Sequence, residues 1–171
     1  HITRPGYQLS LLEDCIRRIS EKYGVQIYLE PGEACALNAG FLVTRVLDIV
    51  QNGDTQIAIL DMSAACHTPD VIEMPYRPPL YGADEPGVLS HTYRLAGPTC
   101  LAGDVIGDYS FPQPLQEGSL LVFGDMAIYT TCKNNTFNGM PLPSIYARRK
   151  NHTTLLARFS YSDFKSRLGH L

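Results

Sequence analysis

The pattern of hydrophobic and polar residues predicts a helix over residues 10–24. Apolar side chains recur every three or four positions on one face of this segment, and charged side chains cover the opposite face. Ser10 and Glu13 have the spacing of a capping box, and Gly24 can end the helix in the left-handed conformation. We therefore expect the helix to pack on a scaffold and to expose its charges.

Residues 25–29 form a β-branched and aromatic run that ends at Glu30-Pro31-Gly32. This composition predicts a buried strand. A helix joined to a strand by a tight turn is the unit of an α/β layer with parallel strands. Ligands bind at the carboxyl ends of such strands, and Glu30 would occupy that position.

The rest of the chain is rich in short β-type runs. Residues 40–50 and 55–61 flank Asn52-Gly53, which is a strong hairpin signal. Further strands are predicted at 88–95, 119–123, 126–132 and 153–161, with Gly and Pro between them. This spacing is typical of an all-β sandwich or barrel. The fold class is therefore α/β plus β, with an α/β portion at 1–36, a β domain at 37–161 and a short helix or tail at 162–171.

Charge and composition exclude several functions. The 171 residues contain 14 Lys and Arg against 17 Asp and Glu, and the net charge is −3. The chain therefore lacks the basic surface that a nucleic acid or an anionic membrane would require. No apolar run reaches the roughly 18 residues needed to cross a bilayer.

The five cysteines are odd in number, widely spaced and without a C-x-x-C pair. This pattern predicts reduced thiols in a cytoplasmic protein, without a disulfide framework or a metal site. The first residue is His1, not Met, within a segment that reads as functional. We therefore expect the chain to be a piece of a longer protein.

Four stretches combine polar residues and glycine beyond what turns require. In the first, the Glu30 carboxylate could hold a protonated ring nitrogen, and the Gly32 amide could approach a phosphate closely. The alternative is a turn with two solvated acids, Glu30 and Glu33. In the second, Asp61 ends an apolar strand and precedes a loop of small residues that contains Asp70. The alternative there is a satisfied turn in which Asp70 caps a short helix.

The third and fourth stretches contain Cys100 and Tyr129. Cys100 lies between Gly97-Pro98 and Gly103, and an accessible loop thiol is a candidate for chemistry, although a buried filler is an equal alternative. Tyr129 precedes an Asn138-Gly139 turn. Its ring could simply pack, or its hydroxyl could bind an anion.

In this order the stretches resemble the C-terminal half of the alanine-racemase-fold (fold type III) pyridoxal-phosphate decarboxylases of amino acids and polyamines. The shared motifs are Glu30-Pro31-Gly32, Gly97-Pro98-Thr99-Cys100 with Asp104, and Tyr129-Thr130 with Phe137-Asn138-Gly139. Glu33 stands where diaminopimelate and ornithine decarboxylases usually carry Arg. With residues 1–7 and 66–70, this departure makes the chain most similar to the carboxynorspermidine (carboxyspermidine) decarboxylase branch.

The resemblance implies the last portion of a TIM-type β/α barrel that binds pyridoxal 5'-phosphate, followed by the β domain. It also implies a head-to-tail homodimer with shared active sites and a polyamine-type substrate. Glu30 would pair with the pyridine nitrogen of the cofactor, Gly32 would lie against its phosphate, and Tyr129 would bind that phosphate. Cys100 would be catalytic and reach into the partner subunit's site.

Four acids are candidates for substrate binding. The resemblance places Asp104 close to the catalytic cysteine and matches Asp61 to an aspartate near the distal amine in some members. The acid that follows the family's cysteine is Leu101 here, so recognition of the distal amine should differ from that in ornithine decarboxylase. Because the expected substrate carries several amines, we also expect Glu33 and Asp70 to bind them and to set specificity.

The expected chemistry agrees with these residues. Decarboxylation leaves a carbanion that a protonated pyridine ring can take up, and a nearby carboxylate such as Glu30 favours that protonated form. A thiol such as Cys100 could return a proton to the α-carbon. None of the lysines, which are Lys22, Lys133, Lys150 and Lys165, is placed at a strand end suited to a desolvated amine. The Schiff-base lysine is therefore expected outside this sequence.

Two other classes remain open. The nearer one is a diaminopimelate-type decarboxylase or an alanine-racemase-like enzyme. The other is a non-catalytic homologue, such as a regulatory antizyme-like protein or an isolated β-domain interaction module. The presence of Glu30, Cys100 and Tyr129 argues against a degenerate homologue.

Overall fold

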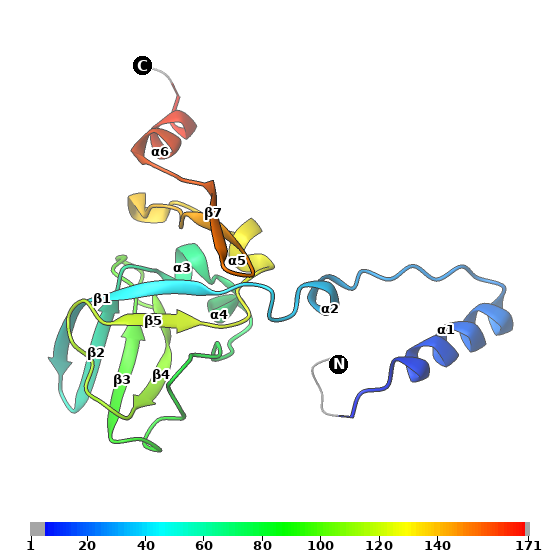
Figure 1. The fold of residues 1–171 in the computed structure, drawn as a ribbon, viewed down its shortest axis with the longest axis horizontal. Helices are drawn as coiled ribbons and strands as arrows, with labels where there is room; N and C mark the ends of the chain where they lie inside the picture. Colours follow the sequence, from blue (N-terminus) through cyan, green and yellow to red (C-terminus); the bar gives the residue numbers. More distant parts are fainter. Residues whose placement is uncertain (1–5, 170–171) are drawn as a thin grey trace. The chain divides into compact units, whose positions relative to one another are not determined.

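The computed structural model describes residues 6–169 (Figure 1). The chain divides after Leu37 into two units, His1–Leu37 and Asn38–Leu171. The sequence placed this boundary after residue 36. Residues 1–5 of the amino-terminal motif lie outside the described residues, as do residues 170–171 of the predicted tail.

The first unit contains the predicted helix, α1 (Leu9–Tyr23). Gly24 ends it at φ 62° and ψ 32°, and its amide donates a hydrogen bond to the Ser20 carbonyl oxygen at 2.8 Å. This confirms the predicted left-handed stop. The predicted capping box of Ser10 and Glu13 is wrong, because the helix starts earlier and Gln8 is its N-cap without a side-chain hydrogen bond.

Residues 25–29 do not form the predicted strand. Val25 and Tyr28 are exposed, and the segment runs without secondary structure to α2 (Gly32–Ala36). A strand needs neighbouring strands to satisfy its backbone groups, and the described part of this unit contains none. Glu30 therefore follows a segment without secondary structure, and residues 6–37 contain no strand of a β/α barrel.

The second unit is a curled, mostly-sheet domain (Figure 1). Its main sheet has the strand order β4-β3-β2-β1-β5, in which β2 and β3 are parallel and the other neighbours are antiparallel. The strands are β1 (Leu42–Asn52), β2 (Thr55–Leu60), β3 (His91–Ala96), β4 (Val105–Phe111) and β5 (Leu120–Phe123). The β1–β2 hairpin turns at Gly53, with φ 57°, as the Asn52-Gly53 signal predicted.

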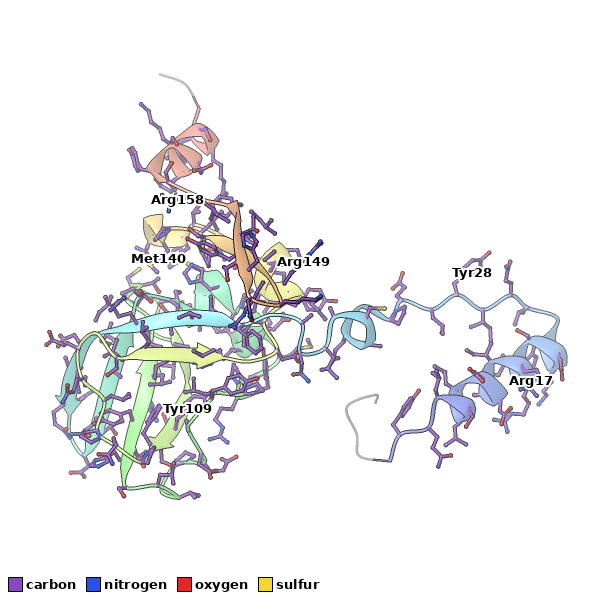
Figure 2. The ribbon with its side chains drawn as sticks, in the orientation of Figure 1. Arg17, Tyr28, Tyr109, Met140, Arg149 and Arg158 are labelled. Atoms are coloured by element: carbon purple, nitrogen blue, oxygen red, sulfur yellow. The ribbon has the colours of Figure 1, made fainter. Side chains whose placement is uncertain are left out.

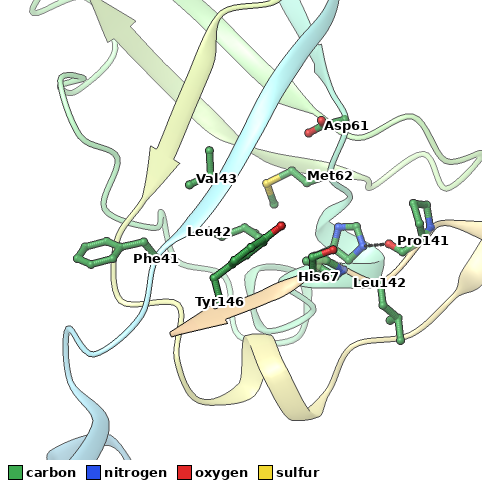
Figure 3. A pocket seen from close by; sticks show the side chains of 11 residues that line it. Phe41, Leu42, Val43, Asp61, Met62, His67, Pro141, Leu142 and Tyr146 are labelled. Atoms are coloured by element: carbon green, nitrogen blue, oxygen red, sulfur yellow. Dashed lines mark hydrogen bonds between the residues drawn. The ribbon is translucent and has the colours of Figure 1, made fainter. Parts of the chain in front are cut away.

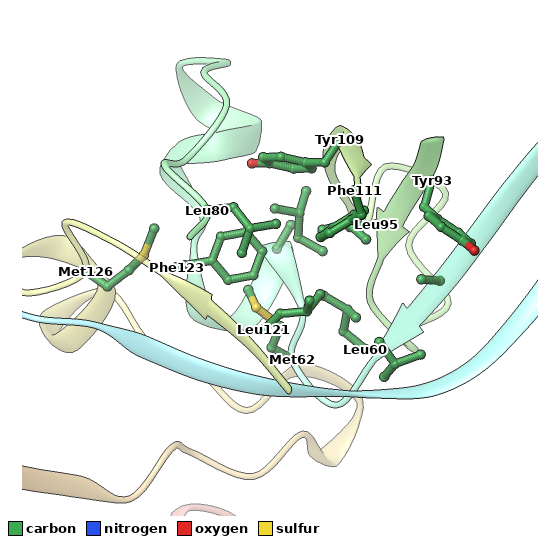
Figure 4. Packing of buried hydrophobic residues seen from close by; sticks show 14 residues of the cluster. Leu60, Met62, Leu80, Tyr93, Leu95, Tyr109, Phe111, Leu121, Phe123 and Met126 are labelled. Atoms are coloured by element: carbon green, nitrogen blue, oxygen red, sulfur yellow. The ribbon is translucent and has the colours of Figure 1, made fainter. Parts of the chain in front are cut away.

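The hydrophobic core lies on the concave side of this sheet (Figure 4). Phe123, Leu60 and Leu95 are completely buried there. Tyr109, which Figure 2 labels within the second unit, packs its ring edge-to-face on Phe123, with the centroids 6.2 Å apart (Figure 4). Its hydroxyl donates to the Pro78 carbonyl oxygen at 2.7 Å. The buried phenol thus keeps a hydrogen-bond partner, which its burial requires.

The remaining elements depart from the predicted pattern of strands. β6 (Ile145–Arg149) pairs with β7 (His152–Ala157) in a separate two-stranded sheet. The predicted strand at 153–161 stops at Ala157, and the expected terminal helix is α6 (Tyr161–Arg167). A capping box of Ser160 and Asp163 starts α6.

The predicted strand at 126–132 is also wrong. The chain instead makes a one-turn helix, α5 (Tyr129–Cys132). The Thr131 hydroxyl bonds back to the carbonyl oxygens of Ala127 and Ile128 at 2.9 and 2.8 Å. These local hydrogen bonds compete with a β-ladder and favour the turn. The other short helices are α3 (Ala64–His67), α4 (Asp70–Glu73) and the 3-10 turn η1 (Phe137–Gly139).

Candidate active-site residues

Asp104 joins two of the predicted stretches inside the second unit. Its Oδ1 atom accepts hydrogen bonds from the Ser63 hydroxyl at 2.9 Å and from the amides of Ala64 and Ala65 at 2.6 and 3.3 Å. Its Oδ2 atom accepts from the amide and hydroxyl of Thr99, at 3.1 and 2.6 Å. The residue is only 3% exposed. These surroundings favour a structural role over the substrate contact suggested by the sequence.

Gly97 is required where it stands because the Asp104 carboxylate packs against it. A Cβ atom at residue 97 would collide with that carboxylate. The Gly97 amide also donates to the Asp104 carbonyl oxygen at 2.8 Å. This hydrogen bond therefore joins the first residue of the loop, Gly97, to its last residue, Asp104.

Cys100 lies exposed in this loop. Its Sγ atom donates a hydrogen bond to Oδ1 of Asn138 at 3.4 Å. Asn138 adopts φ 57°, a conformation that asparagine tolerates better than most residues. The structure thus brings together the cysteine motif and the Phe137-Asn138-Gly139 motif, although Cys100 and Asn138 are 38 residues apart in the sequence.

Asn135 fastens the segment between these motifs to α3. Its backbone amide donates to the Cys66 carbonyl oxygen at 3.1 Å, and its side-chain Nδ2 donates to the Ala65 carbonyl oxygen at 2.7 Å. The Cys66 thiol in turn donates to the Phe137 carbonyl oxygen at 3.5 Å. Sequence reasoning missed Asn135; its position between the two halves of the tyrosine motif was the signal. Burial raises the pKa of the Cys66 thiol, which suits a structural cysteine.

Tyr129 is half-exposed at the start of α5. Within residues 6–169 its hydroxyl makes no hydrogen bond, so the O–H group can donate to an anionic ligand. The ammonium group of Lys133 lies 4.8 Å from the centre of its ring. This geometry is compatible with the predicted contact to a phosphate.

Asp70 has a cation from the same chain beside it. The Lys133 Nζ atom lies 2.6 Å from Oδ1 of Asp70 and 2.9 Å from Oε2 of Glu73. The pKa of Lys133 is raised, first by the hydrogen bond to Asp70 and then by that to Glu73. Sequence reasoning considered Lys133 only as a possible Schiff-base lysine and missed this cluster. An Asp70 carboxylate that is already paired is poorly suited to bind a substrate amine as predicted.

Asp61 lines a pocket of about 400 Å³ within the second unit (Figure 3). Its Oδ1 atom accepts hydrogen bonds from the Thr44 hydroxyl and, at 2.8 Å, from the Arg45 amide. The other pocket residues are mainly apolar and aromatic: Phe41, Leu42, Val43, Met62, Pro141, Leu142, Pro143 and Tyr146, with His67 and Ser144. Asp61 supplies the pocket's carboxylate.

His67 is buried beside this pocket and is held at both ring nitrogens. Nδ1 accepts a hydrogen bond from the Ser63 amide at 3.1 Å, so Nε2 carries the proton and donates to the Pro141 carbonyl oxygen at 3.0 Å (Figure 3). Burial lowers the pKa of His67. In the part of the chain that the structure describes, no group of three His, Cys, Asp or Glu side chains could hold a metal ion.

The remaining predicted residues belong to the first unit. Glu30 is exposed, and Gly32 starts α2 with its amide donating to the Glu30 carbonyl oxygen at 2.9 Å. A Cβ atom on Gly32 would meet nothing within 4 Å. Glu33 is exposed in the first turn of α2. Gly32 and Glu33 thus lie in the first turn of one short helix, and Glu30 lies just before its N-cap, Pro31.

The curled sheet domain and its ordered motifs define the class of this protein. Residues 11–127 match the family model of the pyridoxal-dependent decarboxylase C-terminal sheet domain. The chain therefore belongs to this family, which confirms the resemblance carried by its motifs.

No helix within residues 6–169 is long and apolar enough to cross a membrane.

Individual relatives narrow the similarity to decarboxylases of carboxylated polyamines. A carboxynorspermidine/carboxyspermidine decarboxylase from Campylobacter jejuni is 44% identical to this chain. The matched region covers 98% of this chain and 47% of that enzyme. A carboxyaminopropylagmatine decarboxylase from Synechocystis sp. is 41% identical, with coverages of 98% and 44%. The crystal structure of the Campylobacter jejuni carboxynorspermidine decarboxylase with norspermidine matches with a TM-score of 0.85, at 42% identity over 98% of this chain and 48% of that chain. The chain spans about half the length of these curated relatives.

Proposed function

We propose that the chain is the C-terminal part of a pyridoxal-phosphate-dependent decarboxylase. The enzyme converts carboxynorspermidine or carboxyspermidine to norspermidine or spermidine in polyamine biosynthesis. The 44% identity to the Campylobacter jejuni enzyme over nearly the whole chain carries this proposal. The meeting of Cys100 with Asn138 supports it, because two motifs of the resemblance come together in space.

The residues present suit part of a pyridoxal-phosphate site. Tyr129 is half-exposed, its hydroxyl makes no hydrogen bond in residues 6–169, and a Cβ atom on Gly32 would meet nothing within 4 Å. Tyr129 and Gly32 would hold the phosphate, and Glu30 would hold the protonated ring nitrogen. When bound, the cofactor supplies an electron sink for the carbanion left by decarboxylation.

The lysine that binds the cofactor covalently would come from outside this sequence. Lys133 is held in two ion pairs, and Lys22 lies on the exposed face of α1 beside Tyr23. Lys150 and Lys165 are exposed in a turn and in α6. A Schiff-base amine needs a desolvated site that lowers its pKa, and none of these lysines has one.

Cys100 would move a proton at the substrate's α-carbon. Its thiol is exposed and oriented by Asn138, as a group that acts on a ligand requires. By its resemblance, this thiol would act in the site of the partner subunit in a head-to-tail homodimer. Asp104 would position the loop that carries the thiol.

The substrate's amines would meet acidic side chains. Glu33 and Asp61 are both exposed, and Asp61 supplies the carboxylate of a mainly apolar pocket. Such a pocket suits an alkylammonium chain, whose methylene groups pack on apolar walls while its amine pairs with the acid. The Synechocystis relative favours a second candidate substrate, carboxyaminopropylagmatine, at nearly the same identity.

A substrate panel on the full-length protein tests the proposal. Carboxynorspermidine, carboxyspermidine, carboxyaminopropylagmatine and diaminopimelate would each be incubated with the enzyme, and CO₂ release and the amine product measured. We expect the highest kcat/KM on one of the first two substrates. A preference for carboxyaminopropylagmatine would establish the second candidate, and a preference for diaminopimelate would overturn the assignment. Failure to show a visible absorbance that borohydride abolishes would indicate a non-catalytic homologue.

A further inference from the structure

Lys133 is the centre of a charged cluster in the second unit that the proposed chemistry does not use. Its Nζ atom is within hydrogen-bond distance of both acids of α4, Asp70 at 2.6 Å and Glu73 at 2.9 Å. The same atom lies 4.8 Å from the centre of the Tyr129 ring. One ammonium group therefore contacts α4 and the aromatic ring of α5 together.

The helix that carries Tyr129 is weak on its own. α5 has four residues, its N-cap Ile128 makes no side-chain hydrogen bond, and none of its residues is buried. The Thr131 hydroxyl shapes the turn through bonds to Ala127 and Ile128, but these are local. A single helical turn is not stable without tertiary contacts, because nucleation costs more than one backbone hydrogen bond returns.

The polar attachments of this segment are few. On its N-terminal side, the Met126 amide donates to the Gly40 carbonyl oxygen at 2.9 Å. On its C-terminal side, the backbone amide of Asn135 donates to the Cys66 carbonyl oxygen at 3.1 Å. Among the hydrogen bonds and ion pairs of the described residues, those of Lys133 are the ones that join residues 127–134 to another element.

The charge of Lys133 also matters for an anionic ligand. The Asp70 side chain is 15% exposed and that of Lys133 is 35% exposed, so water screens this pair only partly. Without the lysine, two carboxylates would remain near the ring of Tyr129. Their negative charge would disfavour a phosphate at the Tyr129 hydroxyl.

We propose that Lys133 is a positioning residue for Tyr129. Its ion pairs with Asp70 and Glu73 hold α5 on α4 and fix the Tyr129 hydroxyl where the cofactor's phosphate binds. The proposal rests on the proposed function, because it takes Tyr129 as a phosphate ligand. It also changes the role of Asp70 from binding a substrate amine to supporting the cofactor site.

The test uses the full-length protein with Lys133→Met, Lys133→Arg and the control Lys165→Met, since Lys165 lies exposed in α6. The dissociation constant of pyridoxal phosphate is measured by absorbance titration. We expect about tenfold weaker binding for Lys133→Met. Lys133→Arg and Lys165→Met should bind like the wild type. With saturating cofactor, the kcat of Lys133→Met should stay within a few-fold of the wild-type value.

A triple variant separates attachment from repulsion. In Lys133→Met with Asp70→Asn and Glu73→Gln, the attachment is lost but no carboxylate remains. Positioning predicts that this variant still binds the cofactor weakly, whereas recovery to the wild-type affinity would overturn it. Amide hydrogen exchange of residues 129–135 in the cofactor-free protein should also be faster in Lys133→Met.

The outcomes distinguish this proposal from the proposed function. Unchanged exchange, or unchanged cofactor affinity in Lys133→Met, would overturn the role of Lys133 while the wild type still decarboxylates its substrate. A wild-type protein that neither binds pyridoxal phosphate nor releases CO₂ would overturn the proposed function itself.

Discussion

The Oδ1 atom of Asp104 accepts a hydrogen bond of 2.6 Å from the backbone amide of Ala64, 40 residues earlier in the chain. This contact attaches the loop of Cys100 to the start of α3. The same carboxylate holds Thr99 through its other oxygen. Asp104 thus links the local conformation of a candidate catalytic loop to the packing of the sheet domain.

Replacing Asp104 with Asn should destabilise the protein and disturb the Cys100 loop. The amide of Asn has one acceptor oxygen, so donors on one side would lose their partner in a buried site. We expect a loss of about 1–3 kcal/mol in the free energy of unfolding, measured by chemical denaturation of the full-length protein. The control is Asp108→Asn, because Asp108 forms an exposed ion pair with Arg94. An equal loss in both variants would contradict the structural role of Asp104.

Cys100→Ser should lower kcat at saturating substrate and cofactor. A hydroxyl is a poorer proton donor than a thiol, and the loss of a general acid typically costs about 10²–10⁴ in rate. The matched control is Cys132→Ser, because Cys132 is also exposed and has no hydrogen bond from its thiol in residues 6–169. Steady-state CO₂ release measures both variants. A kcat for Cys100→Ser equal to that of the control would exclude the proposed proton transfer.

Some features could be predicted from the sequence because they depend on neighbouring residues. Gly24 and Gly53 both adopt positive φ, which glycine tolerates, so the end of α1 and the β1–β2 hairpin are local properties. The strand predicted at 25–29 is not local, because its partners would have to come from other strands. The same limit explains α5, where the hydrogen bonds of Thr131 outweighed an apolar pattern.

The candidate site shows the same division. Cys100 and Tyr129 could be chosen from their motifs, but their surroundings come from residues far along the chain. Lys133 and Asp70 are 63 residues apart, and no spacing rule relates them. Asp104 was chosen because the resemblance places it close to Cys100, whereas its burial and its five hydrogen bonds decide its role.

Stability should fall as the pH is lowered through the titration of His67. Burial lowers the pKa of the folded form below the ordinary value of 6.5. The unfolded chain therefore binds the proton first, so the stabilisation is complete above pH 6.5 and is lost as the pH falls towards the folded pKa. The loss is at most about 1.4 kcal/mol per pH unit.

His67→Asn would test this assignment, because its amide oxygen can still accept from the Ser63 amide without titrating. Unfolding free energies measured between pH 5 and 7 should show a shallower slope for this variant. His152→Asn is the control, since His152 is exposed on β7. A slope that His67→Asn leaves unchanged would assign the pH dependence to other groups.

Glu33→Arg should lower the kcat/KM of the full-length enzyme on carboxynorspermidine. Glu33 lies exposed in the first turn of α2, where the proposed function gives it a substrate amine. An arginine would repel the substrate amine that the Glu33 carboxylate attracts, and a charge-assisted contact of this kind is worth about 1.5–3 kcal/mol. We therefore expect kcat/KM on carboxynorspermidine to fall by roughly 10- to 100-fold. Glu21→Arg, on the exposed face of α1, introduces the same change of charge and should leave kcat/KM unchanged. If both variants behave like the wild type, the amines are recognised elsewhere, and Asp61 becomes the acid to test.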